Sequence, residues 1–254
     1  MTSNLSIIIQ TKNEQENIKD CILSAKNLTS NIYIFDMKSQ DKTKEIAKKL
    51  GIDNILTTPE FNYVEPVREL AINKVNSDWI FILDADERIS NQLANEIKSV
   101  IKNNTYSYFK VSRKNIFGKI KWLKHGGWWP DYQIRLINKK NFISWPKQIH
   151  STPIIQGKVG YLKNPIIHYF HGDLEQMVRK TIIFENIESN LLLEANKKVN
   201  LITFFRKFFG ELLRRLFKNL GFLDGSIGII ESLYQSFSKT ITYLFLYEKC
   251  RLKK

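Results

Sequence analysis

The segment Trp79-Ile80-Phe81-Ile82-Leu83-Asp84-Ala85-Asp86-Glu87 joins an apolar run to a cluster of carboxylates. Five apolar residues in succession are typical of a strand that is buried on both faces of a parallel sheet. If the backbone stays extended past Leu83, Asp84 and Asp86 point to the same side, about 6–7 Å apart. Two carboxylates so placed can hold one hard divalent ion, Mg²⁺ or Mn²⁺, that keeps positions for water and phosphate oxygens. The alternative is a solvated turn or a cap for the helix expected over residues 91–101.

Strands and helices alternate through the first hundred residues. Strands are predicted at 5–9, 31–36, 53–56 and 79–83, and helices at 13–27, 43–50, 67–75 and 91–101. The alternation predicts an α/β fold whose sheet is mainly parallel and flanked by helices. Ligands of such sheets bind beyond the carboxyl ends of the strands. Polar residues follow three of these strands, namely Thr11, Lys12, Asn13 and Glu14, then Asp36, then Asp84 and Asp86. Their convergence on one rim favours a functional pair of carboxylates over a turn.

The composition describes a globular protein. The chain has 254 residues, of which 43% are hydrophobic, enough for one large domain or a domain with an appendage. Cys21 and Cys250 are the only cysteines, so neither a disulfide framework nor a CxxC metal motif is expected. The first residues run straight into a predicted strand without the apolar stretch of a signal peptide. The sequence therefore predicts a protein of the cytoplasm.

The formal net charge of +14 predicts attraction to a polyanion, which could be nucleic acid, an anionic membrane surface or a phosphorylated glycolipid. Residues 201–220 interleave phenylalanine and leucine with arginine and lysine at helical spacing. The apolar stretches are too short to span a bilayer, so an amphipathic helix at the membrane interface is expected. A core-packing helix with a basic outer face is the alternative. Nucleic acid is not an expected partner, because no RNA- or DNA-binding motif is present.

The motifs together resemble those of the family 2 glycosyltransferases. The resemblance rests on residues 7–14, on residues 34–41, and on Arg68 sixteen residues before Asp84. It continues through residues 124–131, Arg135-Leu136, His168-Tyr169 and residues 221–225, and is closest to the branch that adds β-linked glucose or related sugars to the lipopolysaccharide inner core. The resemblance implies a GT-A fold, a nucleotide-sugar donor, a divalent metal and inversion at the anomeric carbon.

The resemblance also assigns roles on the donor side. Asp86 is expected to be the more direct metal ligand, with Asp84 as the second carboxylate. Glu87 is expected either to support these ligands without touching the metal or to stand at the N-terminus of the next helix. His168 is the expected third ligand, with His171 a weaker candidate for the same position. The residues expected to line the nucleotide sugar are Thr11, Asn13, Glu14, Asp36, Arg68 and Asp84. A second acid often follows Asp36 in the family, and Met37 in its place leaves the base specificity open.

The general base is ambiguous. The related branch carries His-Glu where this chain has His150-Ser151, so the expected carboxylate is missing. Asp131 is the first candidate and His150 the second, because an inverting transfer needs a base close to the acceptor hydroxyl. Asp131 could instead orient its loop or bind Arg135.

Three residues are expected to bind the acceptor: Trp128, Trp129 and Arg135. An indole face suits the C–H surface of a sugar ring, although two adjacent tryptophans could equally wall a core.

The sequence thus predicts a metal-dependent, inverting hexosyltransferase that moves a sugar, glucose from UDP-glucose, onto a lipid-anchored saccharide such as a lipopolysaccharide core. Residues 1–103 would bind the donor, residues 104–180 the acceptor, and the helical residues 181–254 would hold the protein peripherally on the inner face of the cytoplasmic membrane. The rivals are a catalytically impaired scaffold that binds polyanions and a metal-dependent nucleotidyltransferase. The second rival would need a glycine-rich phosphate loop, which residues 10–14 lack.

Overall fold

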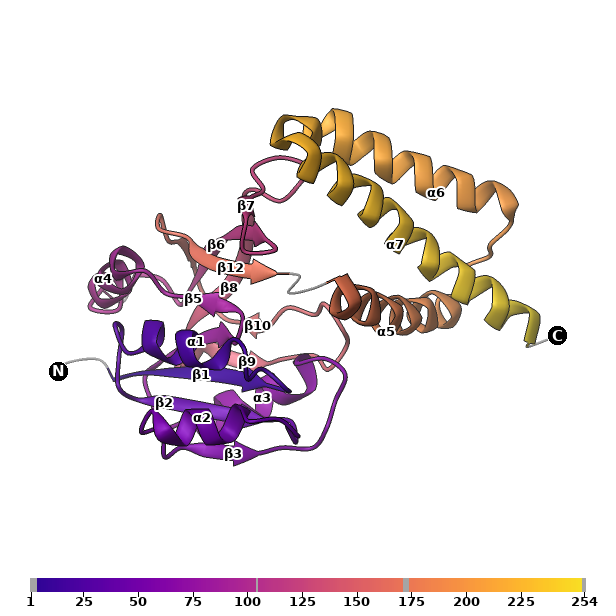
Figure 1. The fold of residues 1–254 in the computed structure, drawn as a ribbon. Helices are drawn as coiled ribbons and strands as arrows, with labels where there is room; N and C mark the ends of the chain where they lie inside the picture. Colours follow the sequence, from indigo (N-terminus) through magenta and orange to yellow (C-terminus); the bar gives the residue numbers. More distant parts are fainter. Residues whose placement is uncertain (1–3, 104, 171–173, 253–254) are drawn as a thin grey trace. The chain divides into compact units, whose positions relative to one another are not determined.

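The computed structural model describes residues 4–103, 105–170 and 174–252 (Figure 1). The chain forms two compact units. The first comprises residues 1–114 and 132–168, and the second comprises residues 115–131 and 169–254.

The first unit is built on a mixed sheet with helices on both sides. Its strands are β1 (Leu5–Thr11), β2 (Ile32–Asp36), β3 (Ile55–Thr57), β4 (Trp79–Asp84), β5 (Glu87–Arg88), β6 (Tyr108–Phe117), β8 (Asp131–Asn138), β9 (Phe142–Ser144), β10 (Ile154–Ile155), β11 (Val159–Tyr161) and β12 (Ile166–Phe170), of which β6, β8 and β12 each have one end in the second unit. Its helices are α1 (Ile18–Ala25), α2 (Thr43–Lys49), α3 (Glu65–Lys74) and α4 (Asn91–Val100), with a short 3₁₀ turn η1 (Lys139–Asn141).

The strand order marks the edge of the sheet where a ligand would bind. The sheet runs β3-β2-β1-β4-β8-β6-β12-β5, and the first four strands are parallel. The order reverses between β1 and β4, the point beyond which ligands of such sheets bind. The register pairs Thr11 with Asp36 and Gln10 with Asp84, so the polar strand ends share one edge as predicted. Strand β8 then pairs antiparallel with β4.

Alternate side chains of the buried strands feed two separate cores. Ile7 and Ile9 of β1 pack with helices α1, α2 and α4, whereas Ile8 packs with α3 on the opposite face. The side chains of β4 alternate between the same two cores. This two-sided burial explains the continuous apolar run of residues 79–83 and confirms the predicted fold class.

Two local predictions were wrong. The helix predicted over 13–27 begins only at Ile18, because Asn13 has a φ of +56° and the N–H groups of Asn13 and Glu14 donate to side chains of the neighbouring loop. The backbone also does not stay extended through the carboxylate cluster. Ala85 and Asp86 form a turn between β4 and β5, so Asp84 and Asp86 are not consecutive same-side positions of one strand.

The second unit is mainly helical. It contains β7 (Lys121–Trp122), α5 (Leu174–Glu194), α6 (Leu201–Leu213), a π-helical turn η2 (Arg214–Lys218), a 3₁₀ turn η3 (Gly221–Asp224) and α7 (Gly225–Leu252). Helix α7 packs against both α5 and α6. None of the helices, over the residues that the structure covers, is long and apolar enough to cross a membrane. The predicted functional division at residues 103 and 180 stays a prediction.

Glycines let the start of α7 approach the turn before it. A Cβ at Gly228 would lie 2.1 Å from the Gly221 carbonyl oxygen, which is backbone and cannot swing away. Gly210 of α6 has open space around it and a helical backbone.

We therefore expect opposite effects from the same change at two helical glycines. Gly228→Ala should lower the free energy of unfolding by about 1–3 kcal/mol through overpacking. Gly210→Ala should raise it by up to about 1 kcal/mol through helix propensity. Urea unfolding followed by circular dichroism measures both, and equal effects would contradict the close approach of Gly228 to Gly221.

Candidate active site

A buried arginine organises the end of β4. Arg135 of β8 is only 2% exposed, and one of its terminal nitrogens lies 2.5 Å from Asp84 Oδ2 and 2.6 Å from Glu87 Oε1. Arg68 of α3 approaches the other oxygen of Asp84, at 3.3 Å. The Asp84 N–H also donates to Glu87 Oε2, at 3.0 Å. Two carboxylates and two arginines therefore form one cluster at the carboxyl end of the central strand.

The cluster sets the charge of its carboxylates. Burial opposes ionisation of Asp84, but Arg135 and Arg68 hold the pKa of its carboxyl well below its usual range. Burial raises the pKa of Glu87, and Arg135 acts against that rise. Burial likewise opposes the charge on Arg135, but Asp84 and Glu87 raise its pKa above the usual value. Asp84 is therefore a carboxylate already neutralised by protein cations.

Asp86 and His168 form a second pair beside this cluster. His168 Nε2 lies 3.5 Å from Asp86 Oδ2, and the two side chains are 12% and 24% exposed. Strand β12 pairs antiparallel with β5, which sets His168 opposite Glu87 and next to the turn that carries Asp86. The structure thus brings together two of the predicted metal ligands across 82 residues of sequence.

The donor set suits a divalent ion that takes its remaining ligands from substrate and water. The described residues hold no group of three or more His, Cys, Asp or Glu side chains arranged for a metal. A carboxylate oxygen and an imidazole nitrogen would fit Mn²⁺ as two protein ligands better than Mg²⁺, which prefers oxygen ligands. Both oxygens of Asp84 are engaged by arginines, so Asp86 is the better placed of the two aspartates. His171 lies outside the described residues.

Asp36 holds the neighbouring strand end together. Its side chain is fully buried; Oδ1 accepts a hydrogen bond from Thr11 Oγ1 at 3.1 Å, and Oδ2 accepts one from the Ser39 N–H at 3.0 Å. Lys44 Nζ lies 3.7 Å from Oδ2. The contacts of Asp36 and Thr11 are therefore mutual ones that fix the loops beyond β1 and β2.

Asn13 and Glu14 belong to the same network. The Asn13 N–H donates to Ser39 Oγ, and the Asn13 side-chain oxygen accepts from the Gln40 N–H, both at 2.8 Å. The Glu14 carboxylate accepts from Asn17 at 2.8 Å. These bonds fix the loops that follow β1 and β2, and the predicted nucleotide contacts stay predictions.

Arg68 and its neighbours add hydrogen-bond donors near the carboxyl end of β4. Its guanidinium lies over the Trp145 ring, 4.7 Å from the centroid. The Arg68 Nε, the Trp145 indole N–H and the side-chain amide of Gln10 are buried and have no hydrogen-bond partner among the described residues. Buried donors without partners are costly, so a polar ligand is the natural complement to them.

The other predicted residues fall in two places. His150 belongs to the first unit, has an exposed side chain and a φ of +60°, and its backbone N–H donates to Glu65 at 3.0 Å. Asp131 belongs to the second unit, where its carboxylate accepts from the Asn115 amide at 3.2 Å. The same amide donates to the Trp128 carbonyl at 3.1 Å, so Asn115 fixes both ends of the segment from 128 to 131.

The two tryptophans differ in setting. Trp128 packs on Phe170 with ring centroids 4.6 Å apart, and Arg215 lies over it at 5.4 Å. Trp129 is 36% exposed and meets Trp122 edge to face. Trp129 is therefore the better placed to stack on a sugar. Arg135, the third residue predicted to bind the acceptor, is instead buried in the carboxylate cluster.

A buried aspartate, Asp224, holds the loop at residues 124–131, here called the tryptophan loop. Asp224 Oδ2 accepts from the N–H groups of Lys124 and His125 at 2.9 and 2.8 Å, and Oδ1 lies 2.9 Å from His125 Nδ1. Arg215 adds a bond to the Gly126 carbonyl at 3.0 Å. The two motifs at 124–131 and 221–225, far apart in the sequence, thus form one structure.

Sequence reasoning missed the roles of Asp224, Arg215 and Trp145. Asp224 lies inside a motif that pointed to function, but its partners are two backbone N–H groups and the His125 ring, about 100 residues away. Nothing in its local sequence indicates that contact.

The fold of this chain is of the GT-A type found in sugar transferases. TarS of S. aureus, crystallised with UDP-GlcNAc, matches with a TM-score of 0.52 over 99% of this chain and 92% of that one, at 12% identity. At that identity the likeness concerns the fold alone.

The model of glycosyl transferase family 2 matches residues 6–160, more than half of the sequence. The chain belongs to this family and is a glycosyltransferase. An uncharacterized glycosyltransferase of Rickettsia conorii is 26% identical over 94% of this chain and 88% of its own length. A dolichyl N-acetyl-α-D-glucosaminyl phosphate 3-β-D-2,3-diacetamido-2,3-dideoxy-β-D-glucuronosyltransferase of Methanococcus voltae is 28% identical over 71% of this chain and 56% of its own length.

Removing Arg135 should be costly. Arg135→Met leaves the buried Glu87 without its cation and Asp84 with Arg68 alone, and we expect the free energy of unfolding to fall by about 3–5 kcal/mol. Arg135→Lys keeps the charge but not the planar guanidinium, so it should lower the free energy of unfolding by less. The exposed Arg179, paired with Glu175, provides the control: Arg179→Met should change stability by no more than about 0.5 kcal/mol. Urea unfolding at neutral pH measures all three, and wild-type stability of Arg135→Met would contradict the cluster.

Proposed function

We propose that this glycosyltransferase moves a hexose, glucose from UDP-glucose, onto a lipid-anchored saccharide, with inversion and with a divalent cation. The Asp86–His168 pair, next to the arginine-fixed Asp84, carries the proposal. It places one carboxylate and one imidazole at the strand end beyond which ligands of this fold bind.

On the donor side, the arginines have a positioning role. Arg135 and Arg68 fix Asp84, and the carboxylate so fixed would face the ribose or metal-bound water. Asp86 and His168 would hold the cation, which when bound neutralises charge on the leaving diphosphate. The unpartnered donors of Arg68 and Trp145 would bind the nucleotide.

On the acceptor side, Asp131 would take the proton from the attacking hydroxyl. It is a carboxylate in a loop held by Asn115, and an inverting transfer needs one close and unprotonated base. His150 is the second candidate. Trp129 would stack on the acceptor sugar because it is the more exposed of the two tryptophans.

A lipid-anchored acceptor has two supports. The Methanococcus relative is named for a sugar linked to dolichyl phosphate. The net charge of +14 would favour an acceptor in an anionic membrane. A lipopolysaccharide core is the acceptor that the sequence motifs favour. Peripheral attachment to the cytoplasmic face follows from this choice.

The metal assignment is tested on the donor alone. Asp86→Asn should lower the rate of UDP-glucose hydrolysis at least about a hundredfold. It should also remove the Mn²⁺ dependence of UDP binding in calorimetry. Asp20→Asn, an exposed aspartate on α1, is the matched control and should match wild type. Mn²⁺-dependent UDP binding that survives in Asp86→Asn would contradict the assignment, and absence of donor binding by wild type would favour the scaffold alternative.

The general base is tested separately. Asp131→Asn should lower hydrolysis by about 10²–10⁴-fold while the Kd for UDP-glucose stays the same. His150→Gln should change neither quantity by more than a few fold. The reverse result would transfer the role to His150, and a changed Kd in Asp131→Asn would mean that Asp131 shapes the donor site instead.

A further inference from the structure

Helix α6 exposes its apolar side. Leu201, Phe205, Phe209, Leu213 and Phe217 recur every four residues along α6 and the π-helical turn, and each is between 52% and 70% exposed. Side chains at this spacing lie along one stripe of a helix. The stripe is therefore a continuous apolar surface about four turns long.

The side of α6 and its π-helical turn that packs inward mixes polar residues with the half-buried Phe204, Phe208, Leu212 and Leu216. Thr203 is buried, and Lys207 lies over the Tyr243 ring of α7, 5.1 Å from its centroid. Glu211 pairs with Arg214 and Arg215 at 2.5 and 2.7 Å. Phe204 contributes an aromatic contact to Tyr247, with ring centroids 6.1 Å apart.

Helix α7 buries mainly small and polar residues and exposes large apolar ones. Its buried positions include Ser232, Ser236, Ser238 and Thr242, whereas Ile230, Leu233, Phe237 and Leu244 are each 45–57% exposed. Ser238 donates to Glu185 Oε1 of α5 at 2.6 Å, and Thr242 donates to Glu185 Oε2. Hydroxyl groups and a carboxylate thus join α7 to α5.

The packing of α7 is the reverse of that of a helix packed in water. A surface helix of a globular protein turns its apolar stripe toward the core. In lipid, apolar contact between helices has no advantage over contact with lipid tails, and small and polar residues join the helices instead. The packing of α7 against α5 therefore fits an apolar surrounding on the exposed side of α7.

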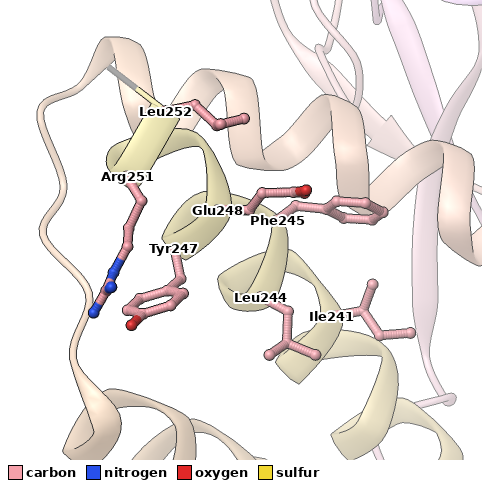
Figure 2. A pocket seen from close by; sticks show the side chains of 7 residues that line it. All are labelled: Ile241, Leu244, Phe245, Tyr247, Glu248, Arg251 and Leu252. Atoms are coloured by element: carbon pink, nitrogen blue, oxygen red, sulfur yellow. The ribbon is translucent and has the colours of Figure 1, made fainter. Parts of the chain in front are cut away.

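The far half of α7 adds an apolar groove (Figure 2). Ile241, Leu244, Phe245 and Leu252 line a recess of about 560 Å³. At its edge Arg251 lies over the Tyr247 ring, 4.9 Å from the centroid. Glu248 also lines the recess, so its rim carries one carboxylate beside the Arg251 cation. The apolar walls suit an acyl chain.

The positive charge of the chain favours one kind of partner for the exposed apolar surface of α6 and α7. Residues 201–220 contain five basic residues and one acidic residue, and the whole chain carries +14. A second copy of the chain would bring the same positive charge, whereas an anionic bilayer neutralises it.

We propose that the exposed faces of α6 and α7 insert into the interface of an anionic bilayer, with Leu201, Phe205, Phe209, Leu213 and Phe217 among the acyl chains. The surface would hold the enzyme at an acceptor that is itself in the membrane. In that respect the inference rests on the proposed function and deepens it.

Flotation of the full chain with vesicles tests the insertion. Wild type should bind phosphatidylcholine vesicles that contain one part in three of phosphatidylglycerol, and bind pure phosphatidylcholine more weakly. Phe205→Ser/Phe209→Ser should weaken binding to the anionic vesicles about a hundredfold, since the variant loses two phenylalanines that would insert into the bilayer. Ile143→Ser on β9, 61% exposed in the first unit, is the matched control and should bind as wild type does.

Two results would overturn the inference: unchanged vesicle binding by the double variant, or no vesicle binding by a wild type that sediments as a dimer and becomes monomeric in the double variant. The second would assign the surface to another copy of the chain. UDP-glucose hydrolysis without lipid, measured in parallel, should be the same in wild type and double variant. Loss of vesicle binding with intact hydrolysis separates this surface from the donor site.

Discussion

The structure of the first unit depends on one buried arginine. Arg135 comes from β8, which runs antiparallel beside β4, and it binds carboxylates on both sides of the turn after β4. The cation permits Asp84 and Glu87 to be buried as a carboxylate cluster at the end of a core strand, which would otherwise be costly. Because the arginines hold Asp84, the turn presents Asp86 separately, and β12 places His168 against it.

The parallel half of the fold could be predicted from the sequence because its signals are local. Continuous apolar runs mark buried strands, and the polar residues after them mark one edge of the sheet. The separation of Asp84 from Asp86 could not be predicted, because the turn at Ala85 depends in part on ion pairs of Asp84 and Glu87 with Arg68 and Arg135, which come from other elements. The late start of α1 has the same kind of cause, since side chains of the loop after β2 take the N–H groups of Asn13 and Glu14.

The second unit shows a different limit. The spacing of the phenylalanines in α6 predicts an amphipathic helix, but either face of such a helix can pack against its neighbours. The serines and threonines of α7 are weak signals taken singly, and only their burial against Glu185 reveals that the polar faces meet. The glycines at 221 and 228 and the carboxylate of Asp224 then join the helical turn to the tryptophan loop.

Anomalous scattering from crystals grown with UDP and Mn²⁺ would locate the cation. We expect a manganese peak within coordination distance of Asp86 Oδ2 and His168 Nε2, with Asp84 still bound to Arg135. A peak coordinated by Asp84, with Arg135 displaced or Asp86 turned away, would contradict this expectation.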